Sequence, residues 1–399
     1  MNPKALSSNN LIPVVCITVF IQTLLTLSST VPVAIAPELT KNLGLPSASI
    51  GFFVSIVYGG AMTASVFGGG LNRRWGPIRI SQSALFCAAI GTLLLTGASL
   101  FLIILGAFFI GLGYGLTNPA ASELLSRVVN STNRNMVFSI KQSGVPLGAV
   151  LAGLTAPSIV ILFNQQVALL LTSGVLLVAA CLLQFIRPAW DINLDSSVQF
   201  KNNPFKNLNV VWHNPAIKYL ALASFFFSAI QMSLGAFTVT MLVDDIDFGL
   251  VQAGFVLSLV QVSGAIGRIF WGRIADHINN GLVVLMALAF VSGVASLLTA
   301  SLDPQSAATL IYGVFILFGL SSIGWNGVYM AEVARLVPAD KIASATGSAL
   351  FVTFAGVLVG PSLFSLMNVY FQQFNIVFGM MALMPAFGFI CALLARRNT

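Results

Sequence analysis

The chain has 399 residues, of which 57% are hydrophobic and only 7% are charged. A soluble domain carries about 25% charged residues, so this composition excludes an ordinary soluble globular protein. The formal net charge of +7 raises the question of nucleic-acid binding, which only the placement of the basic residues can answer.

Twelve apolar stretches follow one another along the chain, and each is long enough to cross about 30 Å of hydrocarbon as a helix. We predict spans at residues 11–37, 46–71, 77–97, 100–125, 136–162, 166–186, 216–243, 250–275, 281–302, 306–333, 343–370 and 374–395. One long polar interval divides them six plus six. We therefore predict an all-α integral membrane protein with an N-terminal six-helix bundle over 1–186, a cytoplasmic linker over 187–215 and a C-terminal six-helix bundle over 216–399.

The first apolar stretch is too long for the core of a cleaved secretory signal, and no small-x-small cleavage site follows it. We read it as an uncleaved first span. The four cysteines lie singly in four different spans, an arrangement that favours packing over disulfides or metal binding. They are Cys16, Cys87, Cys181 and Cys391.

Most basic residues fall on one side of the predicted spans. That side holds Lys4, Arg73, Arg74, Arg79, Arg127, Arg134, Arg187, Lys201, Lys206, Lys218, Arg268, Arg273, Arg335, Lys341, Arg396 and Arg397. The opposite side holds Lys41 with Glu38, Asp244, Asp245, Asp247 and Asp303. By the positive-inside rule, both termini and the linker are cytoplasmic. The basic residues thus orient the protein in the bilayer and need no nucleic acid to explain them.

The chain is internally duplicated. A basic turn, Gly69-Gly-Leu-Asn-Arg-Arg74, ends one apolar segment, and Gly272-Arg-Ile-Ala-Asp-His277 ends another 203 residues later. Farther along, Asn118 and Asn326 match at an offset of 208, as do Arg127 and Arg335. An even number of spans in each half gives parallel repeats, related by an axis along the membrane normal.

Residues 69–76 match the signature Gly-x-Leu-x-x-Arg-x-Gly between spans 2 and 3. With two six-span halves and a cytoplasmic linker, the chain resembles the major facilitator superfamily over essentially its whole length. It departs from the family pattern at Arg73, where the family usually has Asp, while the second copy keeps Asp276 but has His277. The resemblance implies two helical bundles with pseudo-two-fold symmetry around a central cavity, and alternating access by rocking of the halves.

Polar side chains inside a bilayer are costly, so they usually face the bundle interior or a water-filled cavity. Lys141 lies seven residues past Arg134, roughly 10 Å into the helix of span 5. It shares a face with a stripe of small residues at Gly144, Gly148 and Ala152, the kind of surface that packs against another helix. We expect a cavity-facing cation; the alternative is a lysine that snorkels to the cytoplasmic headgroups. The equivalent position in the second half is Ala349.

Span 8 carries Arg268 at a depth similar to that of Lys141, on one stripe with Ser258 and Gln261. The family resemblance implies that spans 5 and 8 are neighbours across the two halves, so Lys141 and Arg268 are expected to flank one anion site. The alternative is that Arg268 pairs with Glu332 near the end of span 10.

Amide side chains occupy matching places in the two halves. Gln22 in span 1 and Gln231 in span 7 lie near the middle of their spans, and Asn118 and Asn326 are repeat-equivalent. All four are candidates for the wall of a substrate cavity, with interhelical packing or a scaffold role as the alternative. Gln142 points about 100° away from Lys141 on an unbroken helix and is expected at a different wall.

Acidic and basic residues end spans 4 and 10, as Glu123 with Arg127 and Glu332 with Arg335. We interpret them, with the two basic turns, as a cytoplasmic gate; the alternative is charges that merely sit among lipid headgroups. The gating candidates are Gly69, Arg73, Arg74, Glu123, Arg127, Gly272, Asp276, Glu332 and Arg335.

Two glycine–proline segments mark candidate sites for kinks and close packing. They are Gly144-Val-Pro146 in span 5 and Gly356 to Pro361 in span 11. The second resembles a family motif associated with antiporters, but that motif usually lies in span 5.

No His-Glu-x-x-His, phosphate-cradling Gly-x-x-x-x-Gly-Lys loop or metal cluster appears in the sequence, so we expect no enzyme activity and no cofactor. Two deep basic residues without a deep acid favour transport of a small organic anion, with a proton as a candidate coupling ion. We expect a monomer in the bacterial inner membrane. The alternatives are a multidrug or amphiphile exporter, which the 31 phenylalanines allow, and a non-transporting receptor, for which the linker is too short to supply an output domain.

Overall fold

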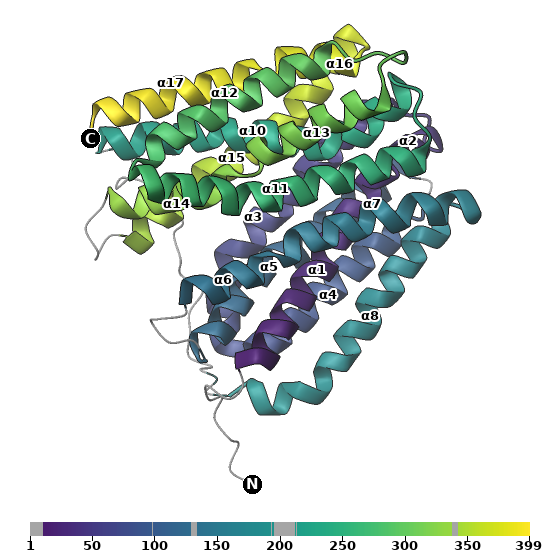
Figure 1. Ribbon diagram of the computed structural model, residues 1–399. Helices are drawn as coiled ribbons and strands as arrows, with labels where there is room; N and C mark the ends of the chain where they lie inside the picture. Colours follow the sequence, from purple (N-terminus) through teal and green to yellow (C-terminus); the bar gives the residue numbers. More distant parts are fainter. Residues whose placement is uncertain are drawn as a thin grey trace. The chain divides into compact units, whose positions relative to one another are not determined.

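The computed structural model describes residues 11–97, 99–128, 134–192, 194, 212, 214–336 and 342–399. Helices make up almost all of these ranges, and no strand occurs within them (Figure 1). Twelve helical segments in the described ranges are long and apolar enough to cross a membrane, which confirms the prediction of an all-α, twelve-span protein.

The helices follow the predicted spans in chain order. They are α1 (Leu11–Ala34), α2 (Ala36–Lys41), the 3₁₀ turn η2 (Ser47–Ser49), α3 (Ile50–Trp75), α4 (Pro77–Leu94), α5 (Leu100–Ser126), α6 (Arg134–Gln142), α7 (Gly144–Leu162), α8 (Gln165–Trp190), α10 (Pro215–Asp244), α11 (Leu250–Ile278), α12 (Gly281–Ala300), α13 (Ala308–Ser322), α14 (Trp325–Arg335), α15 (Ile342–Phe371), α16 (Phe374–Met380) and α17 (Leu383–Arg397).

Three spans are broken into two helices each: α6 with α7, α13 with α14, and α16 with α17. Prolines explain two of the breaks, because a proline has no N–H to donate to the carbonyl four residues earlier. Pro146 cannot donate to the carbonyl of Gln142 at the end of α6. Pro385 cannot donate to that of Met381 just after α16, which accepts from the N–H of Met384 at 2.9 Å instead. By contrast, Pro361 lies inside the continuous helix α15.

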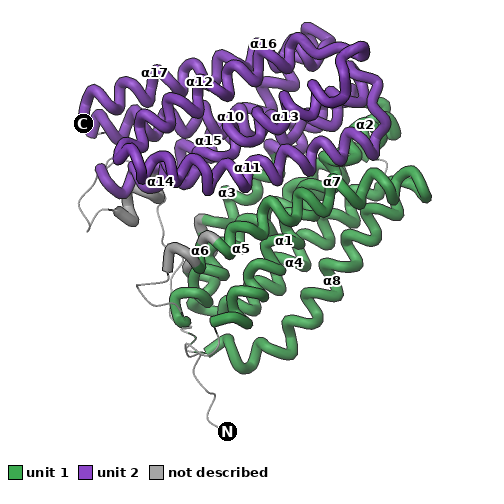
Figure 2. The backbone as a smooth tube through the Cα atoms, in the orientation of Figure 1, with its two compact units in different colours: residues 1–45, 56–202 green, residues 46–55, 203–399 purple. Residues whose placement is uncertain are grey.

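The chain forms two compact units (Figure 2). The first contains residues 1–45 and 56–202, and the second contains residues 46–55 and 203–399. The start of α3 belongs to the second unit because it is bonded to α15. Ser55 donates a hydrogen bond of 2.7 Å to the carbonyl of Leu358, and Ser365 donates one of 2.6 Å to the carbonyl of Ala48.

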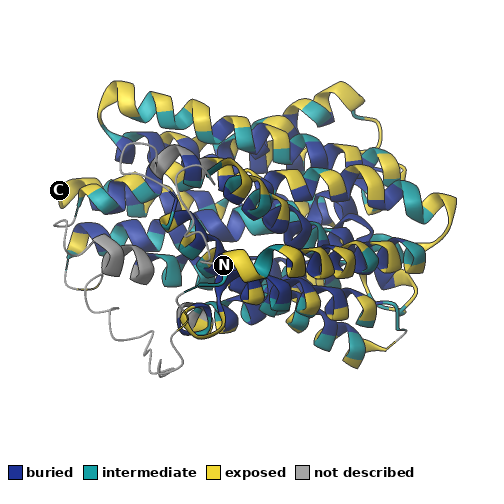
Figure 3. Cartoon of the chain, turned by 90° about the horizontal axis from the view of Figure 1, so that it is seen from below, coloured by how far each residue is buried: buried dark blue, intermediate teal, exposed yellow. Residues whose placement is uncertain are grey.

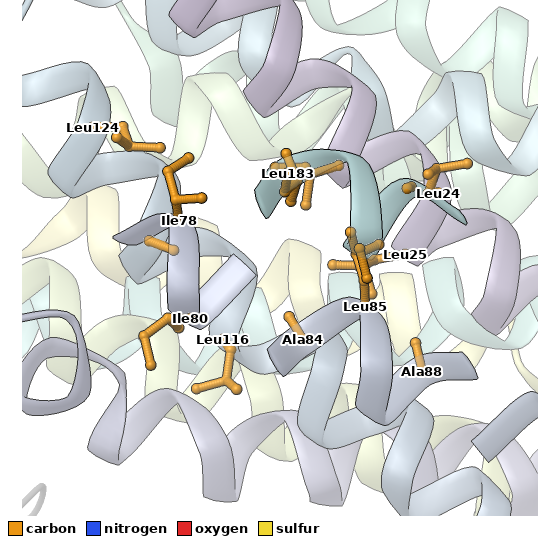
Figure 4. Close-up of a cluster of buried hydrophobic side chains, with 14 of the residues drawn as sticks. Leu24, Leu25, Ile78, Ile80, Ala84, Leu85, Ala88, Leu116, Leu124 and Leu183 are labelled. Carbon is orange, nitrogen blue, oxygen red and sulfur yellow. The ribbon is translucent and has the colours of Figure 1, made fainter. Parts of the chain in front are cut away.

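Each unit has its own apolar core. In the first unit, side chains of α1, α4, α5 and α8 meet, among them Leu25, Leu85 and Leu183 (Figure 4). In the second unit, Trp325 and Tyr329 of α14 pack with leucines of α10 and α12. Dispersion contacts in such cores hold helices together where lipid removes most of the hydrophobic driving force between them.

Exposed residues lie along the outer faces of the helices (Figure 3), and many of them are large and apolar. Phe185 is 83% exposed, Ile12 75% and Leu162 74%. A soluble protein rarely exposes so many large apolar groups together, whereas hydrocarbon accommodates them. The outer surface therefore fits a multi-pass membrane protein.

The two basic segments that end spans 2 and 8 are helical, and the expectation of a turn at those residues is wrong by a few positions. The helix α3 continues to Trp75 and α11 to Ile278. The chain turns at Gly76, with φ of 91°, and at Asn279, with φ of 49°. Gly76 has a ψ of 148°, a region open almost only to Gly, whereas Asn279 has a ψ of 32° and is left-handed helical, which Asn tolerates. These two residues lie 203 positions apart, so each half turns at the corresponding position through a residue with positive φ, although the two turns differ in ψ.

Candidate functional site

Among the described residues whose burial is given, Lys141 is the most deeply buried basic side chain, with only 3% of its surface exposed. Its ammonium nitrogen donates to Gln22 Oε1 at 2.8 Å, to Gln142 Oε1 at 3.2 Å and to Asn118 Oδ1. An ammonium group has three N–H donors, so amide oxygens from α1, α5 and α6 use all of them.

The three acceptors are neutral, and within the described residues no carboxylate forms an ion pair with Lys141. Its hydrogen bonds are satisfied, but its charge is not balanced. Burying an unpaired ion costs several kcal/mol even after relaxation. A site of this kind attracts an anion because the anion supplies the missing charge. The side chain of Lys141 lies buried among α1, α5 and α6 in the first unit and does not extend into solvent.

The local sequence explains how Lys141 reaches Gln22. Two glycines of α7 allow its backbone to approach α1: a Cβ on Gly144 would lie 2.8 Å from Gln22 Cβ, and one on Gly148 would lie 2.8 Å from Thr26 Cβ. The break before Gly144 ends α6 one residue after Lys141. The small-residue face predicted from the sequence is thus the face that packs against α1.

The expectation that Gln142 lies at a different wall is wrong, because its Oε1 accepts a hydrogen bond from Lys141. The prediction assumed an unbroken helix, whereas α6 ends at Gln142. The side chains of Gln142 and Asn118 are both exposed, whereas Gln22 is only 1% exposed. The ammonium therefore has one buried acceptor and two that reach the surface of the unit.

The second unit contains the corresponding amides in a different arrangement. Gln231 Oε1 accepts from Trp325 Nε1 at 2.8 Å and from Asn326 Nδ2 at 3.2 Å. The position equivalent to Lys141 is Ala349, which is fully buried. Here the amides bond to each other and to an indole, all neutral groups, so this cluster has no charge to offer a ligand.

Arg268 and Gln261 lie half-buried on α11, in the second unit. Arg268 Nε donates to the carbonyl oxygen of Ile323 at 3.4 Å. Its suggested partner Glu332 is bonded to the backbone N–H of Gly281 and to Arg335. Lys141 belongs to the first unit, so a shared site with Arg268 stays a prediction.

The gating candidates of the first unit surround one end of α5. Arg127 forms an ion pair with Glu123 at 3.0 Å and also donates to the carbonyl of Trp190 at 2.9 Å. A cavity of about 430 Å³ lies beside them, lined by Asn72, Arg73, Pro119, Ser122, Glu123, Ser126 and Phe138. Arg73 and Arg74 are exposed in the last turn of α3, and Gly69 lies within that helix.

Sequence reasoning missed Asp191, which follows α8. Its two carboxylate oxygens accept from the backbone N–H groups of Ile78 at 2.8 Å and Arg79 at 2.9 Å, at the start of α4. A carboxylate at a helix N-terminus satisfies free N–H groups and complements the helix dipole. Burial raises the pKa of Asp191, and the backbone hydrogen bonds and Arg187 oppose that shift. Since the residue lies in the predicted linker, only its acidic character hinted at a capping role.

In the second unit a different acid caps the corresponding helix. Glu332 is 6% exposed, accepts from Gly281 N at 3.0 Å at the start of α12 and forms an ion pair with Arg335 at 2.7 Å. Gly272 and the exposed Asp276 lie near the end of α11. In both units the acid–base pair lies at the end of a single helix, α5 or α14, and the role of these pairs in a gate stays a prediction.

Comparison with known proteins points to one family. The family model described as Major Facilitator Superfamily matches residues 18–361. An uncharacterised MFS-type transporter of Mycobacterium tuberculosis is 22% identical over 312 residues, covering 73% of this chain and 65% of the relative. The chain thus spans about two thirds of the length of that relative.

Several relatives are named for a solute, including two bacterial transporters. The gentisate transporter of Corynebacterium glutamicum is 26% identical, covering 87% of this chain and 80% of the relative. The hexuronate transporter of Bacillus subtilis is 23% identical, covering 82% and 81%. Among solved structures, a peptide transporter POT in complex with sulfate superposes with a TM-score of 0.78 at 16% identity, covering 96% of this chain and 94% of the other. That likeness shows the fold.

Proposed function

Since the chain belongs to the Major Facilitator Superfamily, we propose that it is a secondary transporter that moves a small organic anion, such as a carboxylate, and binds it at Lys141. One observation carries the proposal: the ammonium of Lys141 is buried, fully hydrogen-bonded and without a carboxylate partner among the described residues. The names of the gentisate and hexuronate relatives support the same class of solute.

The physical role of Lys141 is to supply the charge that balances the ligand. A hydrogen bond between ionised partners is about twice as strong as one between neutral groups. In a site shielded from water, the attraction between a carboxylate and this ammonium is also larger than in bulk solvent. A neutral solute gains neither effect, and a cation is repelled. The site therefore selects anions over neutral solutes and cations by charge, whatever their shape.

The asymmetric distribution of basic residues supports an orientation with both termini cytoplasmic. The bacterial relatives favour the plasma membrane, the inner membrane where a bacterium has two, as the location. The gradient that drives transport remains part of the proposal: a proton is the candidate coupling ion, and the expected unit of function is a monomer with a small-molecule substrate and the lipid bilayer as its partners.

The test begins with the purified full-length protein in detergent. Its thermal denaturation is measured with gentisate, galacturonate, succinate and sulfate, with glucose as a neutral solute and with tetraphenylphosphonium as a lipophilic cation. We expect at least one carboxylate to raise the melting temperature and the other two classes to leave it unchanged.

The same measurement on Lys141→Gln identifies the residue responsible. Glutamine keeps hydrogen-bonding capacity but removes the charge, so we expect the carboxylate-dependent shift to disappear while the unliganded protein still unfolds cooperatively. A shift produced by the cation alone favours the exporter alternative and contradicts the proposal. A panel in which no carboxylate shifts the melting temperature contradicts it as well.

A further inference from the structure

The acceptors around Lys141 pose a problem for any incoming anion. All three ammonium donors already have partners, namely Gln22, Asn118 and Gln142. An anion can make a direct hydrogen bond to Lys141 only where one of these amides moves away. The affinity of the site therefore depends on which amide yields and on how much its bond with the ammonium stabilises the empty site.

Burial separates the three acceptors into two kinds. Gln22 on α1 is 1% exposed and lies against Gly144 of α7, so it has no room to leave. Asn118 on α5 and Gln142 at the end of α6 are exposed, so each has a side that is not packed against protein. Where water reaches such an amide, it satisfies the groups that rotation releases.

We propose that the amide oxygens of Asn118 and Gln142 occupy the place of the anion in the empty site and set its affinity by competing with it for Lys141. The inference rests on the proposed anion site and deepens it. Gln22 holds the ammonium in position in both states.

The second unit supports the distinction between competing and positioning amides. At the equivalent place Asn326 donates its Nδ2 to Gln231 Oε1, whereas in the first unit Asn118 and Gln22 both present oxygens to Lys141. The orientation of the Asn118 amide therefore follows from the cation. When an anion neutralises the cation, the reason for that orientation is removed.

The experiment measures the affinity of the full-length protein for gentisate, or for the carboxylate that shifts its melting temperature most, by isothermal titration. We expect Asn118→Ala to bind the anion about threefold to tenfold more tightly, because a competitor bonded to a charged group is gone. Gln142→Ala is expected to change affinity in the same direction and serves as a second variant where Asn118→Ala fails to fold.

Asn118→Asp supplies the opposite test, because it gives Lys141 a permanent internal carboxylate. We expect anion binding to weaken by more than about thirtyfold, while the melting temperature of the unliganded protein rises. The matched change Asn326→Ala removes an amide that donates to the neutral Gln231, and we expect no tightening of anion binding.

A merely structural asparagine cannot account for tighter binding after its removal. Unchanged or weaker anion binding in both Asn118→Ala and Gln142→Ala would overturn the inference. The proposed function itself fails in a different way, when Lys141→Gln binds the anion as tightly as the unaltered protein. Loss of binding in Lys141→Gln together with weaker binding in Asn118→Ala leaves the anion site standing and removes only the competition.

Discussion

The two units place amides at corresponding positions, but only the first surrounds a charge with them. In the second unit, Gln231 is bonded to Trp325 and Asn326, and the third position is the buried Ala349. In the first unit, Gln22 and Asn118 turn their oxygens to Lys141. The second unit shows that this amide pair needs no cation to pack well. The lysine is therefore an addition to a shared scaffold, and function is to be sought where the two copies differ.

The acidic residues at the ends of the spans differ in a related way. The acid precedes its arginine by four positions in Glu123–Arg127 and by three in Glu332–Arg335. The shift of one position turns Glu332 inward, where it caps α12. Glu123 instead lines the cavity beside Arg73, and Asp191 caps α4. The acid of the corresponding pair thus caps a helix in the second unit, whereas in the first unit it lines a polar cavity.

The largest difference in stability is expected between the two glutamines. Gln22→Leu removes an acceptor from a buried ammonium and is predicted to cost about 2–3 kcal/mol, because hydrogen bonds to charged groups contribute about twice as much as neutral ones. Gln231→Leu removes an acceptor from neutral donors and is predicted to cost about 1 kcal/mol. Denaturation of both variants in the same detergent measures how much unfolding free energy each one loses. Equal losses in the two variants would contradict a charged centre at Lys141.

The acids give the next largest contrast. Glu332→Ala is expected to lower stability by about 2 kcal/mol, since it removes the cap of α12 and leaves a buried N–H group without its acceptor. Glu123→Ala breaks a half-exposed ion pair and is expected to cost at most about 1 kcal/mol. Thermal unfolding of the two variants compares them. A greater loss in Glu123→Ala would show that the cavity side of the first unit matters more for folding than its geometry indicates.

The smallest effect concerns the approach of α7 to α1. A methyl group on Gly148 would overlap the carbonyl oxygen of Thr23 and would lie 2.9 Å from the backbone nitrogen of Leu27. Gly148→Ala is therefore expected to cost about 1 kcal/mol, overpacking being partly offset by the gain in helix propensity, and to weaken anion binding by separating Lys141 from Gln22.

Gly174→Ala is the matched control, because nothing lies within 4 Å of the added methyl group. It is expected to stabilise the protein slightly through helix propensity alone. If Gly148→Ala lowers stability and Gly174→Ala raises it, close packing of α7 on α1 is supported as the means by which Lys141 is positioned. A Gly148→Ala variant that is more stable than the unaltered protein would rule it out.

The architecture could be predicted from the sequence, because hydropathy and the offset between repeats are properties of long segments. Twelve apolar stretches and the 203-residue offset were visible without coordinates, and so was the face that Lys141 shares with Gly144 and Gly148. The hydrogen-bond partners of Lys141 could not be predicted, because they depend on a local break in the helix. Pro146 ends α6 and lets Gln142 turn to Lys141. Capping by Asp191 was equally hidden, since it joins residues 113 positions apart.

The most direct test of the central claim is transport itself. The purified protein is reconstituted into liposomes, and uptake of the labelled carboxylate that binds best is measured for the unaltered chain, Lys141→Gln and Lys141→Arg. We predict that uptake falls at least about tenfold in Lys141→Gln and is retained in part in Lys141→Arg, since the arginine keeps the positive charge. Equal uptake by the unaltered protein and Lys141→Gln would contradict the claim that the charge of Lys141 binds the transported anion.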